Sequence, residues 1–254
     1  METAYLEEGL AYAVKNFQSD KTHLQLDKTL IKENFDLHNK EVLDFGCGMG
    51  GMSLWFAREL GAHVEGVDID ENHIEVALQL NEKFKVPNVT FRLRNIITDP
   101  LDKQFDFIFL NDVIEHIKLE WIQDVLDILI MKNLKKGGTI FFSYPPWEGP
   151  HASHVQRVVH IPWVQFLPQK LVLKLISDHN QKLVGKNDLL SEYLELNHMT
   201  HKKLMFYLRK YNLAQVLRES HAKTKVFPFL KNINPGAFPL KYFVTKELIA
   251  FKKL

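Results

Sequence analysis

The sequence predicts an α/β fold built on a doubly wound parallel sheet. Two observations predict it: short strand-like and helix-like segments alternate from about residue 40 to residue 145, and a glycine-rich turn follows the first strand. The chain has 254 residues, of which 46% are apolar. That length allows one large domain, or a domain with a lid.

The elements follow from the spacing of apolar side chains. The first forty residues form helical pieces, because apolar residues recur there at helical intervals. Helices are also expected around Leu54 to Leu60, ending at Gly61, over residues 71–84, and from about Trp121. Five strands are expected between these helices, at residues 41–45, 63–69, 89–93, 105–110 and 139–144.

The alternation stops after residue 145. Residues 146–199 are rich in aromatic residues, His and Pro, and they predict a lid inserted after strand five, placed over the carboxyl edge of the sheet. A helix is expected from its N-cap Thr200, followed by closing strands at 213–219 and 245–251. The predicted organisation is a helical N-terminal cap, residues 1–38, and a second domain, residues 39–254, that carries the lid.

Charge and cysteine content exclude several classes of protein. Lys and Arg total 32 and Asp and Glu total 31, so a protein that binds nucleic acid by neutralising phosphates is disfavoured. The single cysteine, Cys47, leaves no intrachain disulfide and no multi-cysteine zinc site. The acidic start is unlike a signal peptide, and no apolar run approaches the roughly 18 residues of a membrane span. A cytoplasmic protein is expected.

The strongest local motif is Val42-Leu-Asp-Phe-Gly-Cys-Gly-Met-Gly50. Its glycines let the backbone turn sharply from strand to helix and approach a ligand closely. The spacing Gly46-x-Gly48-x-x-Gly51 also fits a dinucleotide fingerprint. Asp44 favours another ligand, because a carboxylate there suits a cationic group better than a pyrophosphate. Asp68 ends the second strand, where a carboxylate can accept both ribose hydroxyls of an adenosine.

Four segments together resemble the class I S-adenosylmethionine-dependent methyltransferases in order and spacing over residues 40–145. They are the glycine motif, Gly66-Val-Asp-Ile69, Phe105-Asp-Phe-Ile108 with Asp112-Val-Ile-Glu-His116, and Leu134-Lys-Lys-Gly-Gly138. The resemblance implies a Rossmann-like seven-stranded sheet in the order 3-2-1-4-5-7-6 with the last strand antiparallel. It also implies S-adenosyl-L-methionine as the cofactor.

The resemblance assigns cofactor contacts to positions of this chain. Asp44 and the backbone of the loop would hold the methionine part, Asp68 the ribose, and Ile69 would pack on the adenine. Asn95 departs from the family, which usually has an Asp there that meets the adenine amino group, and an Asn brings no charge. The implied set is Asp44, Gly46, Cys47, Gly48, Asp68, Ile69, Asn95, Ile96, Asn111 and Asp112.

Histidines supply the candidate catalytic residues. Asp112 and His116 are four residues apart, so on a helix they would share a face at the carboxyl end of a strand. His116 is the first candidate for a general base, and a structural or substrate-positioning role stays open. His154 and His160 in the lid are alternative bases. With His151 they have poor spacing for a metal and no nearby acids or cysteines, so no metal site is expected.

The sequence therefore predicts methyl transfer to a small, partly apolar or aromatic acceptor, at an oxygen atom. Two alternatives stay open. The second glycine spacing allows a nicotinamide-dependent oxidoreductase, and a cofactor-binding protein that has lost catalysis would carry the same motifs. The identity of the acceptor and the oligomeric state do not follow from the sequence.

Overall fold

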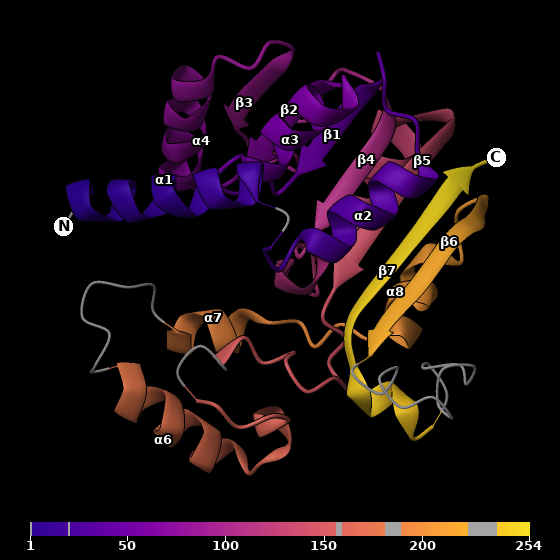
Figure 1. Cartoon of the computed structure of the whole chain (residues 1–254). Helices are drawn as coiled ribbons and strands as arrows, with labels where there is room; N and C mark the ends of the chain where they lie inside the picture. The colour runs from indigo at the N-terminus through magenta and orange to yellow at the C-terminus, as the bar shows by residue number, and fades with distance from the viewer. Residues whose placement is uncertain (1, 20, 156–158, 181–188, 223–237) are drawn as a thin grey trace.

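The computed structural model describes residues 2–19, 21–155, 159–180, 189–222 and 238–254. Seven strands form one sheet in the order β3-β2-β1-β4-β5-β7-β6 (Figure 1). β7 is antiparallel to both of its neighbours, and the other pairs are parallel. The predicted fold class and strand order are confirmed. The strands are β1 (Glu41–Phe45), β2 (His63–Asp68), β3 (Val89–Leu93), β4 (Phe105–Asn111), β5 (Leu134–Tyr144), β6 (Leu213–Ala222) and β7 (Val244–Lys253).

Helices connect and cover the strands. α4 begins where Asp70 accepts the main-chain N–H of Asn72 at 2.8 Å, and α3 ends at Gly61, whose φ is 67°. The helices are α1 (Glu2–Gln18), α2 (Gln25–Asn34), α3 (Gly51–Leu60), α4 (Glu71–Phe84), η1 (Ile114–His116), α5 (Ile122–Leu126), η2 (Asp127–Asn133), η4 (Val164–Phe166), α6 (Gln169–Asn180), α7 (Leu189–Glu195), α8 (His201–Leu208) and η7 (Leu240–Phe243).

The start of β5 differs from the prediction. The strand begins at Leu134, not at Thr139, because Leu134 already pairs with Phe105 of β4. The next pair joins Thr139 to Phe107, so the residues between Leu134 and Thr139 bulge out of register. Gly137 lies in this bulge with a φ of 77°, a conformation that favours glycine.

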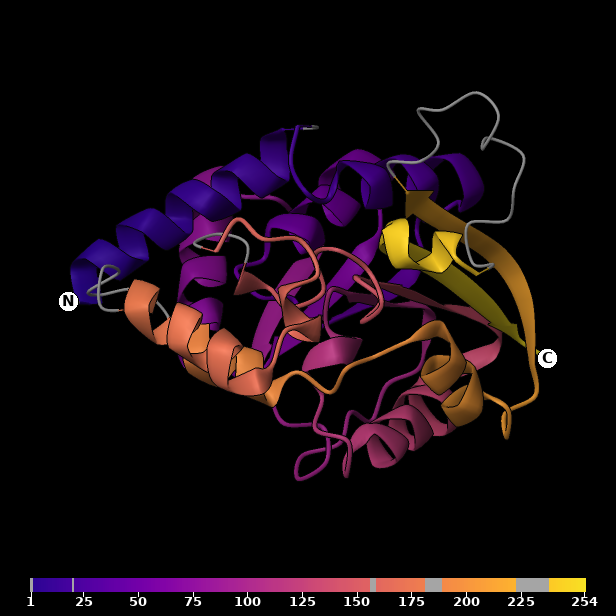
Figure 2. The same ribbon diagram turned by 90° about the horizontal axis from the view of Figure 1, so that it is seen from below.

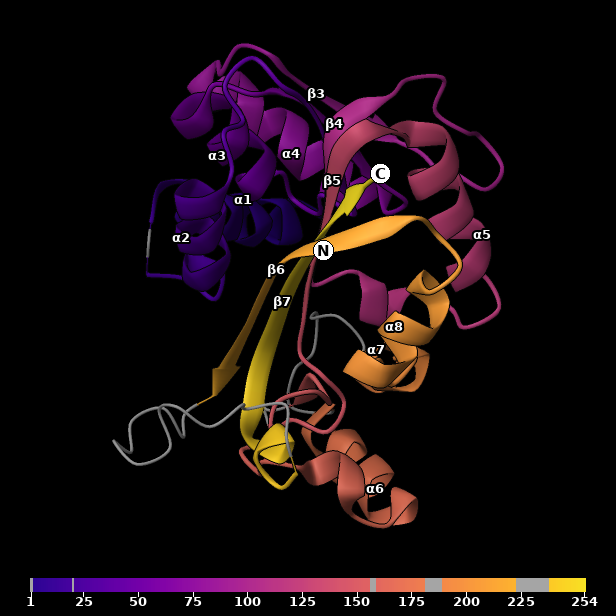
Figure 3. The ribbon, with the colours of Figure 1, turned by 90° about the vertical axis from the view of Figure 1, so that its right-hand side faces the viewer.

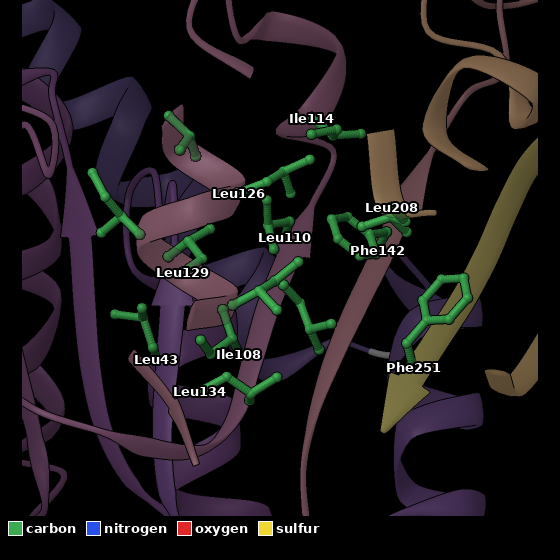
Figure 4. Packing of buried hydrophobic residues seen from close by; sticks show 14 of the residues in the cluster. Leu43, Ile108, Leu110, Ile114, Leu126, Leu129, Leu134, Phe142, Leu208 and Phe251 are labelled. Atoms are coloured by element: carbon green, nitrogen blue, oxygen red, sulfur yellow. The ribbon is translucent and has the colours of Figure 1, made fainter. Parts of the chain in front are cut away.

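Side chains on the central strands alternate between two apolar layers. Val42 and Phe109 face the layer covered by α1 to α4, whereas Leu43 and Ile108 face the layer of α5, η2 and α8. Figure 3 shows the two groups of helices on opposite sides of the sheet. The packing of Leu43, Ile108 and their neighbours against the second group is drawn in Figure 4. A sheet buried on both faces leaves its carboxyl edge as the place for a site.

Two segments border that edge. α1 packs on α3 and α4, and a Cβ built at Gly9 would lie 3.3 Å from Met49 Cε, so this helix passes close to the glycine loop. The described parts of residues 146–199, including α6 and α7, lie beyond the carboxyl ends of β4 and β5 (Figures 1 and 2). They share an apolar cluster of their own, which contains Val164, Val172 and Ile176. Among the described residues, no helix is both long and apolar enough to cross a membrane.

Candidate active site

The glycine loop turns directly over the end of β2. The main-chain N–H groups of Gly46 and Cys47 both donate to the carbonyl oxygen of Val67, at 2.8 and 3.0 Å. Gly46 has a φ of 71°, and a Cβ there would lie 2.6 Å from Val113 Cγ2, so both the conformation and the close contact require glycine. A Cβ at Gly48 would meet no atom within 4 Å. The loop is therefore tight on its β4 side and open at Gly48.

Asp68 holds the loop in this shape. Its Oδ2 accepts the N–H of Gly48 at 2.8 Å and its Oδ1 accepts the N–H of Asp70 at 2.9 Å. Burial alone would raise the pKa of Asp68, but His73 and these two N–H groups outweigh burial and lower it. The pKa of His73 is raised in turn by its contact with Asp68, in which Nδ1 of the ring lies 3.7 Å from Oδ1 of the carboxylate. Asp68 is thus an ionised acceptor at the end of β2.

Asp44 is a deeply buried carboxyl group at this end of the sheet. It is 2% exposed, and its Oδ2 accepts the hydroxyl of Ser53 at 2.6 Å. Burial and the charge of Asp68 together raise the pKa of Asp44 to about 6, against the lowering effect of the Ser53 hydrogen bond. The amide of Asn111 also lowers this pKa. Neither polar atom of that buried amide has a hydrogen-bond partner within the described part of the chain.

The remaining cofactor candidates surround these two acids. Ile69 is 74% exposed, so a large apolar side chain stands in water beside Asp68. Asn95 is exposed and accepts the N–H of Ile97 at 3.0 Å. The side chain of Ile96 is buried in the core, which leaves only its main chain for a ligand. Burial raises the pKa of the Cys47 thiol well above its usual value, as expected for a small loop residue.

This arrangement fits S-adenosyl-L-methionine. Two carboxylates suit a ligand with a positively charged sulfur and an ammonium group, and the second stands where ribose hydroxyls can be accepted. The exposed Ile69 offers an apolar surface for a purine ring. The buried amide of Asn111 has donor and acceptor atoms that no described residue satisfies, which is typical of a group that meets a ligand.

Asp112 lies in a buried ion-pair network. Its Oδ2 lies 2.9 Å from Lys246 Nζ, which is also 2.7 Å from Oδ2 of the fully buried Asp27. Burial alone would lower the pKa of Lys246, but the two carboxylates outweigh burial and raise it. Asp112 itself has a φ of 54° and precedes η1, so the expectation that it shares a helix face with His116 is wrong. The helix is a single 3-10 turn that starts only at Ile114.

The structure brings two of the three candidate catalytic histidines together. The ring centroids of His116, at the end of η1, and His154, in the lid, are 4.9 Å apart. The carboxylate of Glu115 lies beside them, with its Oε1 3.8 Å from His154 Nε2. His160 is exposed on the lid and is not part of this group.

Several residues of the site were not predicted from the sequence. Glu115 stands inside the motif Asp112-Val-Ile-Glu-His116, so its place beside His116 was a usable signal. Lys246 and Asp27 are 219 residues apart and carry no local signal. Asn197 donates to the carbonyls of Ile114 and Ile117, at 2.6 and 2.8 Å. It thereby joins the end of the lid to the turn that carries Glu115 and His116.

Comparison with known proteins agrees with this geometry. A family model described as a methyltransferase domain matches residues 36–205, more than half of the chain. The chain is 32% identical to phosphoethanolamine N-methyltransferase 2 of Caenorhabditis elegans over 103 residues, which are 40% of this chain and 23% of that enzyme. It is also 32% identical to ubiquinone biosynthesis O-methyltransferase of Pseudomonas fluorescens (strain Pf0-1) over 117 residues, 44% of this chain and 47% of that enzyme. The alignments thus span less than half the length of these two relatives.

A solved structure shares the fold over most of its length. Geranyl diphosphate C-methyltransferase from Streptomyces coelicolor A3(2), in complex with Mg²⁺, geranyl-S-thiolodiphosphate and S-adenosyl-L-homocysteine, superposes with a TM-score of 0.59 at 16% identity. The match covers 91% of this chain and 76% of that one. Together with the match to the methyltransferase domain, the sheet order and the two acids, this shows that the chain belongs to the class I S-adenosylmethionine-dependent methyltransferases.

Proposed function

We propose that this protein transfers the methyl group of S-adenosyl-L-methionine to an oxygen atom of a small-molecule acceptor. When bound, the cofactor supplies an electrophilic methyl carbon on a positively charged sulfur. Asp44 and Gly46 to Gly48 would hold its methionine part and Asp68 its ribose. Ile69 would pack on the adenine ring, and Asn95 and the main chain of Ile96 would lie at the edge of that ring. Asn111 and Asp112 would form the remaining wall of the cofactor site. Most of the rate then comes from holding acceptor and methyl group in line.

The observation that carries the choice of oxygen is a cluster of three polar side chains, Glu115, His116 and His154. Glu115 and His116 follow Asn111 and Asp112 closely in the sequence, and His154 of the lid lies beside them. A neutral amine attacks with its own lone pair, whereas a hydroxyl has to lose a proton as it attacks. A base beside the acceptor contributes roughly 10²- to 10⁴-fold to such a reaction. His116 is the proposed base, with His154 and His160 as the alternatives. The relatives named above are described as N- and O-methyltransferases and the solved structure as a C-methyltransferase, so their names do not decide the acceptor atom.

A partly apolar acceptor is supported by the aromatic side chains of the lid and of the segment before β7. Trp163, Phe166, Tyr242 and Phe243 line an open hollow of about 410 Å³. Trp163 Nε1 donates to the carbonyl of Tyr242 at 2.7 Å, which joins the two segments. Such a surface suits an acceptor with an aromatic or alkyl body and one reactive hydroxyl.

The proposal is tested first by binding and then by turnover. In calorimetry, S-adenosyl-L-methionine and S-adenosyl-L-homocysteine should bind, and NAD(H) and NADP(H) should not. Turnover is then measured with radiolabelled methyl donor on matched pairs of phenols and anilines of the same carbon skeleton. Transfer to the phenols supports the proposal. Transfer only to the anilines would show that the acceptor atom is nitrogen and would contradict the proposal. Binding of the methyl donor without any transfer would favour a catalytically silent cofactor-binding protein.

A further inference from the structure

Three side chains with metal-ligating atoms meet at the carboxyl edge of the sheet. One ligand atom from each of Glu115, His116 and His154 lies within 4.8 Å of the other two. Glu115 and His116 come from η1 and His154 from the lid, so the group forms only when the lid is in place. Atoms bound to one cation are about 3 to 3.5 Å apart, given metal–ligand bonds of roughly 2.1 Å. The ring of the exposed His116 therefore has only a short way to move.

Glu115 points to a ligand that the described residues do not supply. It is 3% exposed, and neither of its carboxylate oxygens has a hydrogen-bond partner among the described residues. The ammonium of Lys246 is held by Asp27 and Asp112. Leaving a buried carboxylate unpartnered costs several kcal/mol by general estimates, so such a group normally neutralises or coordinates a metal.

His154 has the orientation of a metal ligand. Its Nδ1 lies 3.3 Å from Oε1 of Glu192, and its Nε2 faces Oε1 of Glu115 at 3.8 Å. A histidine that binds a metal through one ring nitrogen usually donates the other N–H to a carboxylate, which fixes the tautomer. Glu192, on α7, stands in that outer position.

The local charge also favours a cation. The carboxyl groups of Asp27 and Asp112 both contact Lys246, whereas Glu115 makes no ion pair with a lysine or an arginine among the described residues. A divalent cation beside Glu115 offsets the excess negative charge.

We propose that Glu115, His116 and His154 bind one divalent cation of the Mn²⁺, Fe²⁺ or Zn²⁺ class, with Glu192 orienting His154. Two imidazoles and one carboxylate form a donor set that suits these ions better than Mg²⁺ or Ca²⁺. Three protein ligands leave coordination positions open, next to the Asn111 and Asp112 wall of the cofactor site. The role of the cation rests on the proposed function: it would lower the pKa of a bound acceptor hydroxyl, whose proton would pass to water, and it would take over the role given above to His116, which acts as the base when no cation is bound. The binding of the cation does not rest on that function.

Metal binding is measured on the full chain in the absence of cofactor and acceptor. The protein is stripped with a chelator and desalted, and Mn²⁺ is titrated by calorimetry and by loss of the free-ion signal in electron paramagnetic resonance. Mn²⁺ is the first probe because it is the weakest of these ions toward stray histidines. A second titration uses Zn²⁺. One cation per chain is expected.

Variants assign the site. Glu115→Gln, His116→Ala and His154→Ala should each weaken binding at least tenfold. The matched control is His38→Ala, which removes an exposed imidazole just before β1, at the opposite end of the sheet. Circular dichroism and the affinity for S-adenosyl-L-homocysteine show whether each variant is folded. If Glu115→Gln does not fold, His116→Ala still tests the site, because His116 is exposed.

The outcomes separate this inference from the proposed function. One bound cation that is lost in the three variants, with no methylation of a hydroxyl, supports the site and contradicts the function. Methylation of a hydroxyl by protein that binds neither Mn²⁺ nor Zn²⁺ supports the function and overturns the site. Binding that the variants leave unchanged also overturns it, because the cation then binds elsewhere on the chain.

Discussion

Two halves of the carboxyl edge differ in how their charges are satisfied: the half around Asp44 and Asp68, proposed to bind the cofactor and called the cofactor half, and the half around Asp112, Glu115 and His116, proposed to face the acceptor and called the acceptor half. In the cofactor half, Asp68 accepts two main-chain N–H groups, and Asp44 accepts a hydroxyl from the adjacent helix. In the acceptor half, Asp27 and Asp112 share one lysine, and Glu115 has no hydrogen-bond partner among the described residues. In the cofactor half, Asp68 and Asp44 therefore have hydrogen-bond donors from the protein itself, without a ligand. The second half holds more charge than its own residues compensate.

Removing the shared lysine should produce the largest effect on stability. Lys246→Met leaves Asp27 and Asp112 without their common partner, and breaking such a buried pair costs about 3–5 kcal/mol. Chemical denaturation measures the change in the free energy of unfolding. Lys252→Met, an exposed position on the same strand, is the control and should stay within about 0.5 kcal/mol. Equal stability of both variants would show that the acceptor half tolerates its excess charge.

The catalytic contribution of the acceptor half is tested at His116. His116→Ala should lower turnover by about 10²-fold or more, while the affinity for S-adenosyl-L-methionine changes little. Steady-state kinetics and calorimetry give the two quantities separately. His160→Ala should have a smaller effect, because His160 lies outside the group of His116 and His154. A larger loss of turnover in His160→Ala than in His116→Ala would indicate that the base is His160 of the lid.

The cofactor half is tested at Asp68. Asp68→Ala should weaken the binding of S-adenosyl-L-methionine at least tenfold, since charge-assisted hydrogen bonds contribute roughly 1.5–3 kcal/mol each. It also removes the acceptor of the Gly48 N–H. Calorimetry measures the affinity, and a thermal unfolding curve shows whether the fold is retained. The control is Asp102→Ala, at an exposed acid in the loop before β4. An unchanged affinity in Asp68→Ala would contradict the proposed contact between Asp68 and the ribose.

The smallest effect is expected from pH. With a pKa of about 6, Asp44 is mostly protonated at pH 5 and mostly ionised at pH 7. A positively charged ligand prefers the ionised form, so the affinity for S-adenosyl-L-methionine should rise with pH through that range, by up to about tenfold. Asp44→Asn should bind more weakly and lose this dependence, apart from the contribution of His73 to the charge near Asp68. A profile that stays the same in the variant would assign the titration to another group.

The same contrast explains what the sequence could predict. The fold and the cofactor half depend on contiguous signals: apolar runs, a glycine turn and acids at strand ends. These signals place Asp44 and Asp68 on the two successive strands β1 and β2, which the glycine turn and α3 connect. The seven-stranded order was implied by a family resemblance and is confirmed. The proposed roles of the individual site residues remain predictions.

The acceptor half could not be assembled in this way. Its members come from α2, η1, the lid and β7, and the pairing of Lys246 with Asp27 depends on how those elements pack rather than on any local pattern. The spacing of His151, His154 and His160 within the lid gave no reason to pair His154 with Glu115. The helix expected across Asp112 and His116 is only a 3-10 turn, because the chain takes a left-handed turn at Asp112.

The contacts of Asn197 join the downstream end of residues 146–199 to η1. Its side-chain amide holds two carbonyls of the η1 turn, and its own N–H donates to the carbonyl of Glu115 at 2.9 Å. The downstream root of the lid is therefore fastened to the floor of the acceptor site. Residues 146–199 are thereby tied at their downstream end to the turn that carries Glu115 and His116, so any displacement of His154 relative to Glu115 has to arise upstream of Asn197.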